Sequence, residues 1–148
     1  MPQSFADVYL HIVFATLNRQ PFLTDAQLRK DTHAYIGGIA KQLGCQPLGV
    51  GGVDDHVHVL AKLSRQTAIS DLIRDLKSNS SRWIRPKFAD FQWQSGYAAH
   101  SFGKSDLPDL QHYVNTQEEH HRTVSFVDEY RGLLDEHGFE YDEKYLWS

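Results

Sequence analysis

Apolar side chains recur with two different periods along residues 8–102, in an order that few folds can accommodate. Residues 8–16 alternate at the period of a strand, and residues 26–43 carry an apolar stripe at helical spacing. The same patterns predict strands over residues 46–53, 56–63 and 96–102, and a second helix from about residue 67 to Pro86. The elements therefore follow one another as strand, helix, strand, strand, helix, strand.

This order is typical of the split βαβ, ferredoxin-like arrangement, an α+β fold in which an antiparallel sheet carries both helices on one face. The first helix should begin at a capping box over residues 24–27 and end at Gly44. Two further helices are expected, over residues 107–122 and from Ser125 to Gly138, and the earlier one should cover the other face of the sheet. We expect a first strand buried on one face only.

The size and composition of the chain favour one domain spanning residues 1–148. A chain of 148 residues with 41% apolar content can build one core, but it is short for two. Residues 1–4 lack the basic start and apolar run of a secretory signal, and no membrane-spanning run follows, so we expect a cytoplasmic protein without a membrane partner. Cys45 has no second cysteine to pair with and sits in an apolar stretch, which favours a packed thiol.

His56 and His58 are separated by one residue in the strand expected over residues 56–63. Side chains at i and i+2 of a strand point the same way, with Cβ atoms about 6.5–7 Å apart, so both rings can converge on one ion. Imidazole suits manganese, zinc or cobalt, and magnesium prefers oxygen ligands. Taken alone, such a pair more often has a role other than metal binding.

Tyr113 and Gln117 are four residues apart in the expected third helix and would lie on one face of it. Gln117 could offer its carbonyl oxygen to a metal, and Tyr113 could aim its hydroxyl at a metal-bound phosphate. A phenol with a pKa near 10 needs a nearby cation or base before it attacks at neutral pH. The alternative for Tyr113 is an aromatic residue at the core boundary with its hydroxyl in water.

Charge is distributed unevenly along the chain, whose formal net charge is -4. Residues 62–87 have a net charge of +5, and residues 117–148 have a net charge of -6. The basic segment could follow a phosphate backbone, or both segments could be ordinary solvated helix faces. The residues that we single out as candidates for DNA binding are Arg74, Lys77, Arg82 and Arg85.

Three segments resemble the single-tyrosine transposases, the HUH (histidine, hydrophobic, histidine) enzymes of the IS200-like insertion sequences and their relatives associated with repetitive palindromes. These segments are residues 9–21, 55–58 and 113–121, which match in order and spacing over nearly the whole chain. The resemblance implies a ferredoxin-like fold in which His56 and His58 match the metal ligands. Tyr113 matches the nucleophile, and Gln117 matches the polar residue that completes the metal site.

The resemblance also implies a reaction. Such an enzyme binds single-stranded DNA hairpins at the ends of a mobile element, with a divalent metal (magnesium or manganese), and Tyr113 attacks the scissile phosphate to leave a 5′-phosphotyrosine and a free 3′-hydroxyl. The bond energy stays in the covalent link, so no nucleotide cofactor is expected. Members of the family act as homodimers joined through their sheets, often with the tyrosine helix reaching the partner's histidines.

Four further residues receive supporting roles. His11 should face the same side as the two ligand histidines, packed or beside a ligand, and one of His120 and His121 could approach the metal or the DNA. Asp55 either orients a ligand histidine or shapes the turn. Two other functions stay open at this point: a domesticated DNA-hairpin binder without catalysis, and a small metal-dependent phosphoesterase.

Overall fold

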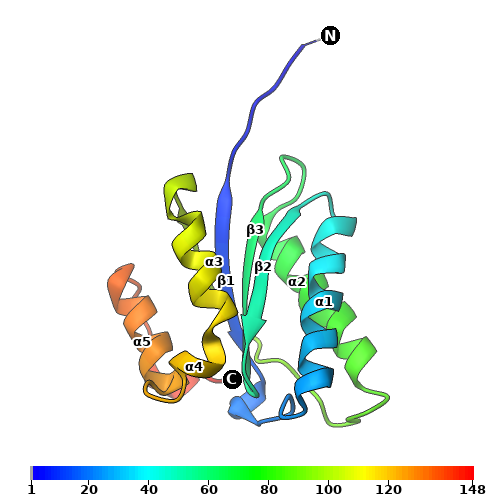
Figure 1. Cartoon of the computed structure of the whole chain (residues 1–148), viewed down its shortest axis with the longest axis vertical. Coiled ribbons are helices and arrows are strands. Elements are labelled where there is room, and N and C mark those ends of the chain that lie inside the picture. Colours follow the sequence, from blue (N-terminus) through cyan, green and yellow to red (C-terminus); the bar gives the residue numbers. More distant parts are fainter. Residues whose placement is uncertain (1) are drawn as a thin grey trace.

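The computed structural model describes residues 2–148 (Figure 1). In chain order the elements are β1 (Tyr9–Ala15), η1 (Leu17–Arg19), α1 (Ala26–Gln42), β2 (Gln46–Gly52), β3 (His56–Lys62), α2 (Ile69–Ile84), β4 (Ala98–Phe102), η2 (Lys104–Asp106), α3 (Leu107–Asn115), α4 (Gln117–His120), α5 (Phe126–Glu136) and η3 (Glu143–Tyr145). No helix in residues 2–148 is long and apolar enough to cross a membrane.

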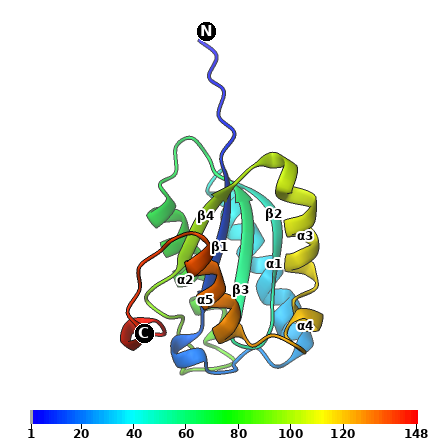
Figure 2. The ribbon, with the colours of Figure 1, turned by 90° about the vertical axis from the view of Figure 1, so that its left-hand side faces the viewer.

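The strands form one antiparallel sheet in the order β2-β3-β1-β4. Helices α1 and α2 lie on one face of this sheet, and α3, α4 and α5 lie on the other (Figures 1 and 2). The predicted ferredoxin-like order, with its two crossover helices on one face, is therefore confirmed.

The main core lies between the sheet and helices α1 and α2. Alternate residues of the two central strands fill it from the sheet side, and both helices add an apolar stripe. The fully buried members include Ile12, Phe14, Val57, Val59, Ile36, Leu72, Leu76 and Ile84. Tyr35 of α1 and Ile69 of α2, apolar positions of the two predicted helices, are each 38% exposed. Tyr35 instead stacks on Trp83, with ring centroids 5.0 Å apart.

The opposite face of the sheet is also closed. Val13, Ala15 and Ala98 pack there against Phe126, Tyr130 and Leu134 of α5, together with the chain end around Trp147. Every residue of β1 is consequently buried, which corrects the expectation of a strand buried on one face only. The third helix covers only the β2 and β3 side of this face, because α5 packs on β1 and β4 (Figure 2).

Helix α3 approaches the sheet at Gly51. A Cβ atom at this position would overlap the carbonyl oxygen of Val114, and Gly51 is the cross-strand neighbour of His58 in β3. The absence of a side chain therefore lets α3 lie directly beside the histidine-bearing strand.

Several element boundaries differ from the prediction by one or two residues. The side chain that caps α1 is Asp25, which accepts a hydrogen bond from the Leu28 amide at 2.8 Å, so the cap lies one residue after Thr24. Strand β4 begins at Ala98, and α2 begins at Ile69. Cys45 is buried, as expected, and lies next to the Ser64 amide.

Candidate active site

The sheet places a group of histidines on the face that α3 and α5 cover. His56 and His58 alternate with Val57 in β3, so both leave the strand on this face, and both are fully buried. His11 of the neighbouring strand β1 leaves on the same face and is 2% exposed, as its strand period predicts. Burial of so many imidazoles requires partners for their nitrogen atoms, since an unpaired buried polar atom is costly.

His56 is held at both nitrogen atoms. Its Nδ1 lies 2.8 Å from Oδ1 of Asp55, and its Nε2 lies 3.1 Å from Oε1 of Gln117. The ring also stacks on Phe126 of α5, with centroids 3.8 Å apart. Asp55 serves the turn as well, because its carbonyl oxygen accepts the Thr16 amide at 2.8 Å. Both roles considered for Asp55 are therefore present.

The third helix is not continuous from Leu107 to Arg122, which corrects the prediction. It breaks at Thr116, whose φ of -113° and ψ of 27° leave the helical region between α3 and α4. The Thr116 hydroxyl bonds back to the carbonyl oxygen of His112 at 2.8 Å, an interaction that bends helices. Gln117 therefore opens a new turn, and its side-chain Nε2 donates a hydrogen bond to the Tyr113 carbonyl at 3.3 Å.

Tyr113 lies beside the histidines of its own chain. Its ring centroid is 5.5 Å from that of His58 and 6.4 Å from that of His11. Its hydroxyl donates a hydrogen bond to Oε2 of Glu129. Burial, with the added charge of Glu129, raises the pKa of Tyr113 well above its usual value. The hydroxyl is thus held in place in its protonated form.

Glu129 is the one residue at the centre of the cluster that sequence reasoning missed. It is 8% exposed, and its Oε1 lies 3.0 Å from Nε2 of His58, 3.3 Å from that of His121 and 3.5 Å from that of His56. Burial alone would raise the pKa of Glu129, but hydrogen bonds from His121 and His58 outweigh it, so the pKa lies below its usual range. Its position offered a signal: Glu129 is a charge on the apolar stripe of α5, one residue before Tyr130.

His121 and His120 both approach Glu129 from the turn after α4. His121 Nε2 lies 2.9 Å from Oε1 of Gln117, and hydrogen bonding to Glu129 raises its pKa despite partial burial. His120 Nε2 lies 2.9 Å from Glu129 Oε2 but makes no hydrogen bond there or elsewhere. His121 therefore lies beside the donor atoms of His56 and Glu129, and the expectation that one of the pair approaches a metal or DNA stays a prediction.

The donor atoms fit a divalent metal. Nitrogen atoms of His56 and His121 and an oxygen atom of Glu129 lie within 4.8 Å of one another, and His58 and Gln117 contact the same group. Burial lowers the pKa of His58 to about 4, so the ring is neutral at physiological pH, as a metal ligand must be. The unpartnered Nε2 of His120 is a further donor that the protein alone leaves unused.

A cleft of about 690 Å³ gives access to Tyr113 from the side of α5. Its lining includes four histidines and the carboxylates of Asp106, Asp109, Asp128, Glu129 and Glu136. An approaching phosphate would meet this negative charge at close range, which costs free energy unless a cation compensates. The carboxylates of the cleft and the donor set therefore both favour a bound cation.

The candidate DNA-binding side chains lie on α2, across the sheet from the histidines. Arg74, Lys77, Arg82 and Arg85 line a groove of about 610 Å³ between α2 and residues 92–97. Lys77 is turned inward, where its ammonium donates to the carbonyl oxygens of Gln94, Ser95 and Gly96 at 2.7–3.1 Å. Burial lowers the pKa of Lys77 to about 8. Arg74 pairs with Asp71 and Asp75 on the same helix, at 3.1 and 3.2 Å.

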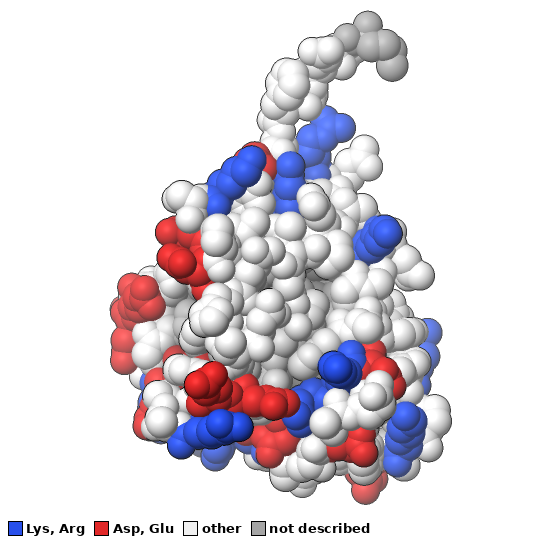
Figure 3. Space-filling view, in the orientation of Figure 1, with Lys and Arg blue, Asp and Glu red and all other residues white. Residues whose placement is uncertain are grey.

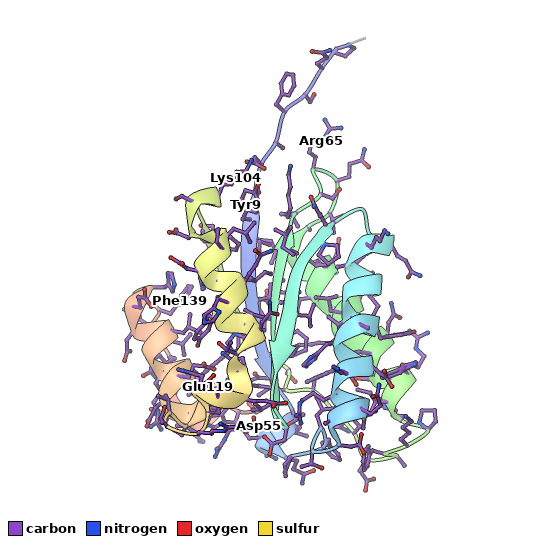
Figure 4. The ribbon with its side chains drawn as sticks, in the orientation of Figure 1. Tyr9, Asp55, Arg65, Lys104, Glu119 and Phe139 are labelled. Carbon is purple, nitrogen blue, oxygen red and sulfur yellow. The ribbon has the colours of Figure 1, made fainter. Side chains whose placement is uncertain are left out.

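One part of the surface near the candidate site carries no charged side chains. On the face seen in Figure 3, lysine, arginine, aspartate and glutamate gather around the edge and leave the middle uncharged, over β2 between α3 and α1. Arg29 pairs with Glu118 of α4. Asp55 and Glu119 lie at the lower end of the molecule as drawn in Figure 4.

Comparison with known proteins connects this geometry to a family. The family model described as "Transposase IS200 like" matches residues 4–117. A candidate transposase from Deinococcus radiodurans R1 is 22% identical, covers 79% of this chain and 98% of its own, and superposes with a TM-score of 0.62. A REP-associated tyrosine transposase bound to a REP hairpin is 13% identical, covers 84% of this chain and 74% of its own, and gives a TM-score of 0.59. No curated protein sequence matches the chain. At these identities the structural neighbours show the fold.

Proposed function

The chain belongs to the IS200-like transposases, and from that membership we propose that it cleaves and rejoins single-stranded DNA through a covalent bond to Tyr113. The observation that carries the proposal is the meeting of the Tyr113 hydroxyl with the ring of His58 and the carboxylate of Glu129 in one buried cluster. Nucleophile and metal ligands come together within one chain, which supports a site assembled without a partner subunit. The expected homodimer stays a prediction.

In the proposed site, His56, His58 and the carbonyl oxygen of Gln117 hold a divalent metal such as magnesium or manganese. When bound, the metal would polarise the phosphodiester and favour the phenolate form of Tyr113. Asp55 accepts the Nδ1 proton of His56, so the Nε2 lone pair of that ring is directed at the metal. The nitrogen-rich donor set suits manganese better than magnesium.

The proposed reaction begins with attack of the Tyr113 oxygen on the scissile phosphorus. The bond from phosphorus to the 3′ oxygen breaks, and that oxygen leaves as a 3′-hydroxyl after taking a proton from water. The phenolic proton passes to water along its hydrogen bond to Glu129, whose low pKa keeps the carboxylate ionised. In the second step of the reaction, a 3′-hydroxyl attacks the 5′-phosphotyrosine and forms a new phosphodiester. The bond between phosphorus and the Tyr113 oxygen breaks, and Tyr113 is released as a phenol.

The proposed substrate is a DNA hairpin, because a structural neighbour is bound to one. The groove of α2 supplies Arg74, Arg82 and Arg85 for phosphate contacts, whereas Lys77 supports the adjoining loop. In this proposal the basic groove binds the folded part of the DNA, and the flanking single strand crosses to the acidic cleft that holds Tyr113. A cytoplasmic location remains an expectation from the sequence.

The test is a covalent adduct. Single-stranded oligonucleotides that carry imperfect palindromes from the DNA flanking the coding region are incubated with the protein and manganese, and the products are separated under denaturing conditions. Tyr113→Phe should abolish the adduct without loss of DNA binding, and the exposed Tyr145→Phe should retain it. Chelation of the metal should prevent the adduct, and added manganese should restore it.

The same assay separates the two other functions. If the chain is a hairpin binder without catalysis, the wild-type protein binds the oligonucleotides but forms no covalent adduct with them. A metal-dependent phosphoesterase releases cleaved DNA with no covalent phase, and its activity survives Tyr113→Phe. Either outcome would contradict the proposed strand transfer.

A further inference from the structure

A second pocket, which we call the α1 pocket, lies on the other side of α3 and α4 from the cleft beside Tyr113. Its volume is about 460 Å³, and it is lined by residues 26–33 of α1, the end of β2 and the junction of α3 with α4. These elements are neighbours in the fold (Figure 1). Gln117 lines the α1 pocket, and its side-chain oxygen lies 3.1 Å from Nε2 of His56. The pocket therefore adjoins the cluster that we propose to hold a metal.

The side chains of the α1 pocket differ in charge from those of the cleft. Two cations, Arg29 and Lys30, line the pocket, and its single carboxylate, that of Glu118, is paired with Arg29. Lys30 is exposed. The cleft beside Tyr113, by contrast, is lined by five carboxylates. A DNA strand that continues from the metal cluster past Gln117 therefore meets positive charge, which favours its phosphates.

The pocket also contains hydrogen-bonding groups without partners. Nε2 of His33 is buried and has no hydrogen-bond partner in residues 2–148, which costs free energy that a ligand in the pocket would remove. Strand β2 lies at the edge of the sheet, so the backbone groups on its outer side have no strand partner, and its last three residues line the pocket. These groups can pair with the donors and acceptors on the edge of a nucleobase.

The His33 ring suits a base better than a phosphate. Burial, with the added charge of Arg29, lowers the pKa of His33 to about 4. The ring is therefore neutral at physiological pH and offers one N–H and one acceptor nitrogen, as the edges of nucleobases do. The permanent charges of Arg29 and Lys30 remain for the phosphate of the same nucleotide.

We propose that the α1 pocket binds one unstacked nucleotide of the single strand that flanks the cleaved bond, with its base against His33 and the end of β2 and its phosphate beside Lys30. The inference rests on the proposed function, because it takes single-stranded DNA as the substrate.

The pocket would determine which bond is cut. Tyr113 and the proposed metal ligands act on a phosphate, and phosphates carry no sequence information. A base fixed beside Gln117 sets the register of the strand, because the backbone must then pass the metal cluster at a defined number of nucleotides from that base. His33 thus contributes to the choice of cleavage site without taking part in the chemistry.

The test removes bases one at a time. Fluorescein-labelled oligonucleotides with the imperfect palindromes of the adduct assay carry one abasic site at successive positions of the single-stranded flank. Affinity is measured by anisotropy with Tyr113→Phe, which keeps the DNA uncut. One abasic position should weaken binding about tenfold. A scan in which no position matters would overturn the inference.

Variants of His33 in the same background assign that position to the pocket. With His33→Ala, the abasic site should cause no further loss, because the group that contacts the base is already gone. His33→Gln keeps a hydrogen-bonding amide and should retain about threefold discrimination. His112 is an exposed histidine of α3 outside the pocket, so His112→Ala is the control and should keep the tenfold loss. A tenfold loss that persists in His33→Ala would overturn the inference.

Lys30 tests the phosphate half of the site. Lys30→Gln should reduce the slope of log affinity against log salt by about one phosphate contact. Lys41, an exposed lysine at the other end of α1, does not line the pocket, and Lys41→Gln should leave the slope unchanged. Equal slopes for Lys30→Gln and Lys41→Gln would contradict a phosphate beside Lys30.

Failure of this inference can be told apart from failure of the proposed function. A covalent adduct with wild-type protein, together with an abasic scan that His33→Ala does not alter, would reject the pocket and leave strand transfer standing. An abasic position that depends on His33, without any adduct under all metal conditions, would reject strand transfer and leave the pocket standing. A protein that binds none of the oligonucleotides would reject the pocket.

Discussion

The two faces of the sheet are built from the same strands but close in different ways. On the face toward α1 and α2, Ile12, Phe14, Val57 and Val59 are fully buried among aliphatic and aromatic neighbours. On the face toward α3 and α5, the alternating positions of the same two strands carry His11, His56 and His58, which are equally buried but satisfied by one another and by Glu129.

The difference shows that alternate residues of the same strands can stabilise the fold on one face of the sheet and form a candidate active site on the other. Aliphatic burial stabilises the fold without directional requirements, whereas each buried imidazole needs a partner at each nitrogen. The histidine face is therefore arranged by hydrogen bonds, beside an apolar cluster that includes Phe126, Tyr130 and Leu134. We expect perturbations of the two faces to have separable effects on stability and on metal binding.

The largest expected effect comes from the aliphatic face. Phe14 is fully buried and packs edge-on against Trp93, with centroids 4.8 Å apart. Phe14→Ala should lower the free energy of unfolding by about 3–5 kcal/mol, because it leaves a cavity in a packed core. Urea denaturation measures the loss. The metal affinity of the molecules that remain folded should not change, and a parallel loss of affinity would show that the two faces are coupled.

A smaller loss is expected where α3 docks on the histidine face. Gly51→Ala would place a Cβ atom against the Val114 carbonyl, so we expect a loss of about 1–3 kcal/mol and a displaced α3. Hydrogen exchange of the α3 amides, together with the adduct assay, measures the displacement. Gly132 in α5 has open space around its Cα, and Gly132→Ala should stabilise the chain slightly. Normal adduct formation by Gly51→Ala would show that this contact does not place Tyr113.

The sequence predicted the aliphatic face better than the histidine face. The strand and helix periods of residues 8–102 follow directly from apolar burial, so the order of elements and the core stripe could be read from the chain. The break of the third helix at Thr116 depends on a local side-chain bond to His112 that no periodicity reports. Glu129 was missed because its partners, His58 and His121, are distant in sequence or belong to another element. Closure by α5 over β1 likewise depends on tertiary packing.

Acid should weaken the histidine face in a predictable way. The unfolded pKa of His11 is about 6.5, and burial lowers its folded pKa to about 2. Between these values the unfolded chain binds a proton that the folded chain excludes, so stability falls as pH falls. His11 should contribute a loss of about 1.4 kcal/mol between pH 7.5 and pH 5.5. Denaturation across this range should show a shallower pH dependence in His11→Phe than in the wild type, and identical profiles would contradict a neutral buried His11.

The smallest expected effect lies outside both faces, on the outer side of α2. Arg82 donates a hydrogen bond to Asn79 and lines the groove, so Arg82→Gln should weaken DNA binding and reduce the slope of log affinity against log salt by about one phosphate contact. Fluorescence anisotropy over a series of salt concentrations measures the slope. Lys41→Gln, an exposed charge at the end of α1, is the control and should leave the slope unchanged. An equal slope for Arg82→Gln and wild type would remove Arg82 from the proposed groove.

Anomalous diffraction from crystals soaked in zinc tests the distinction between the faces most directly. A peak about 2.0–2.1 Å from Nε2 of both His56 and His58, in the same cavity as the Tyr113 hydroxyl, is the predicted result. A protein with both histidines in place and no peak beside them, or with zinc bound only elsewhere, would contradict the assignment of this face to metal-assisted chemistry.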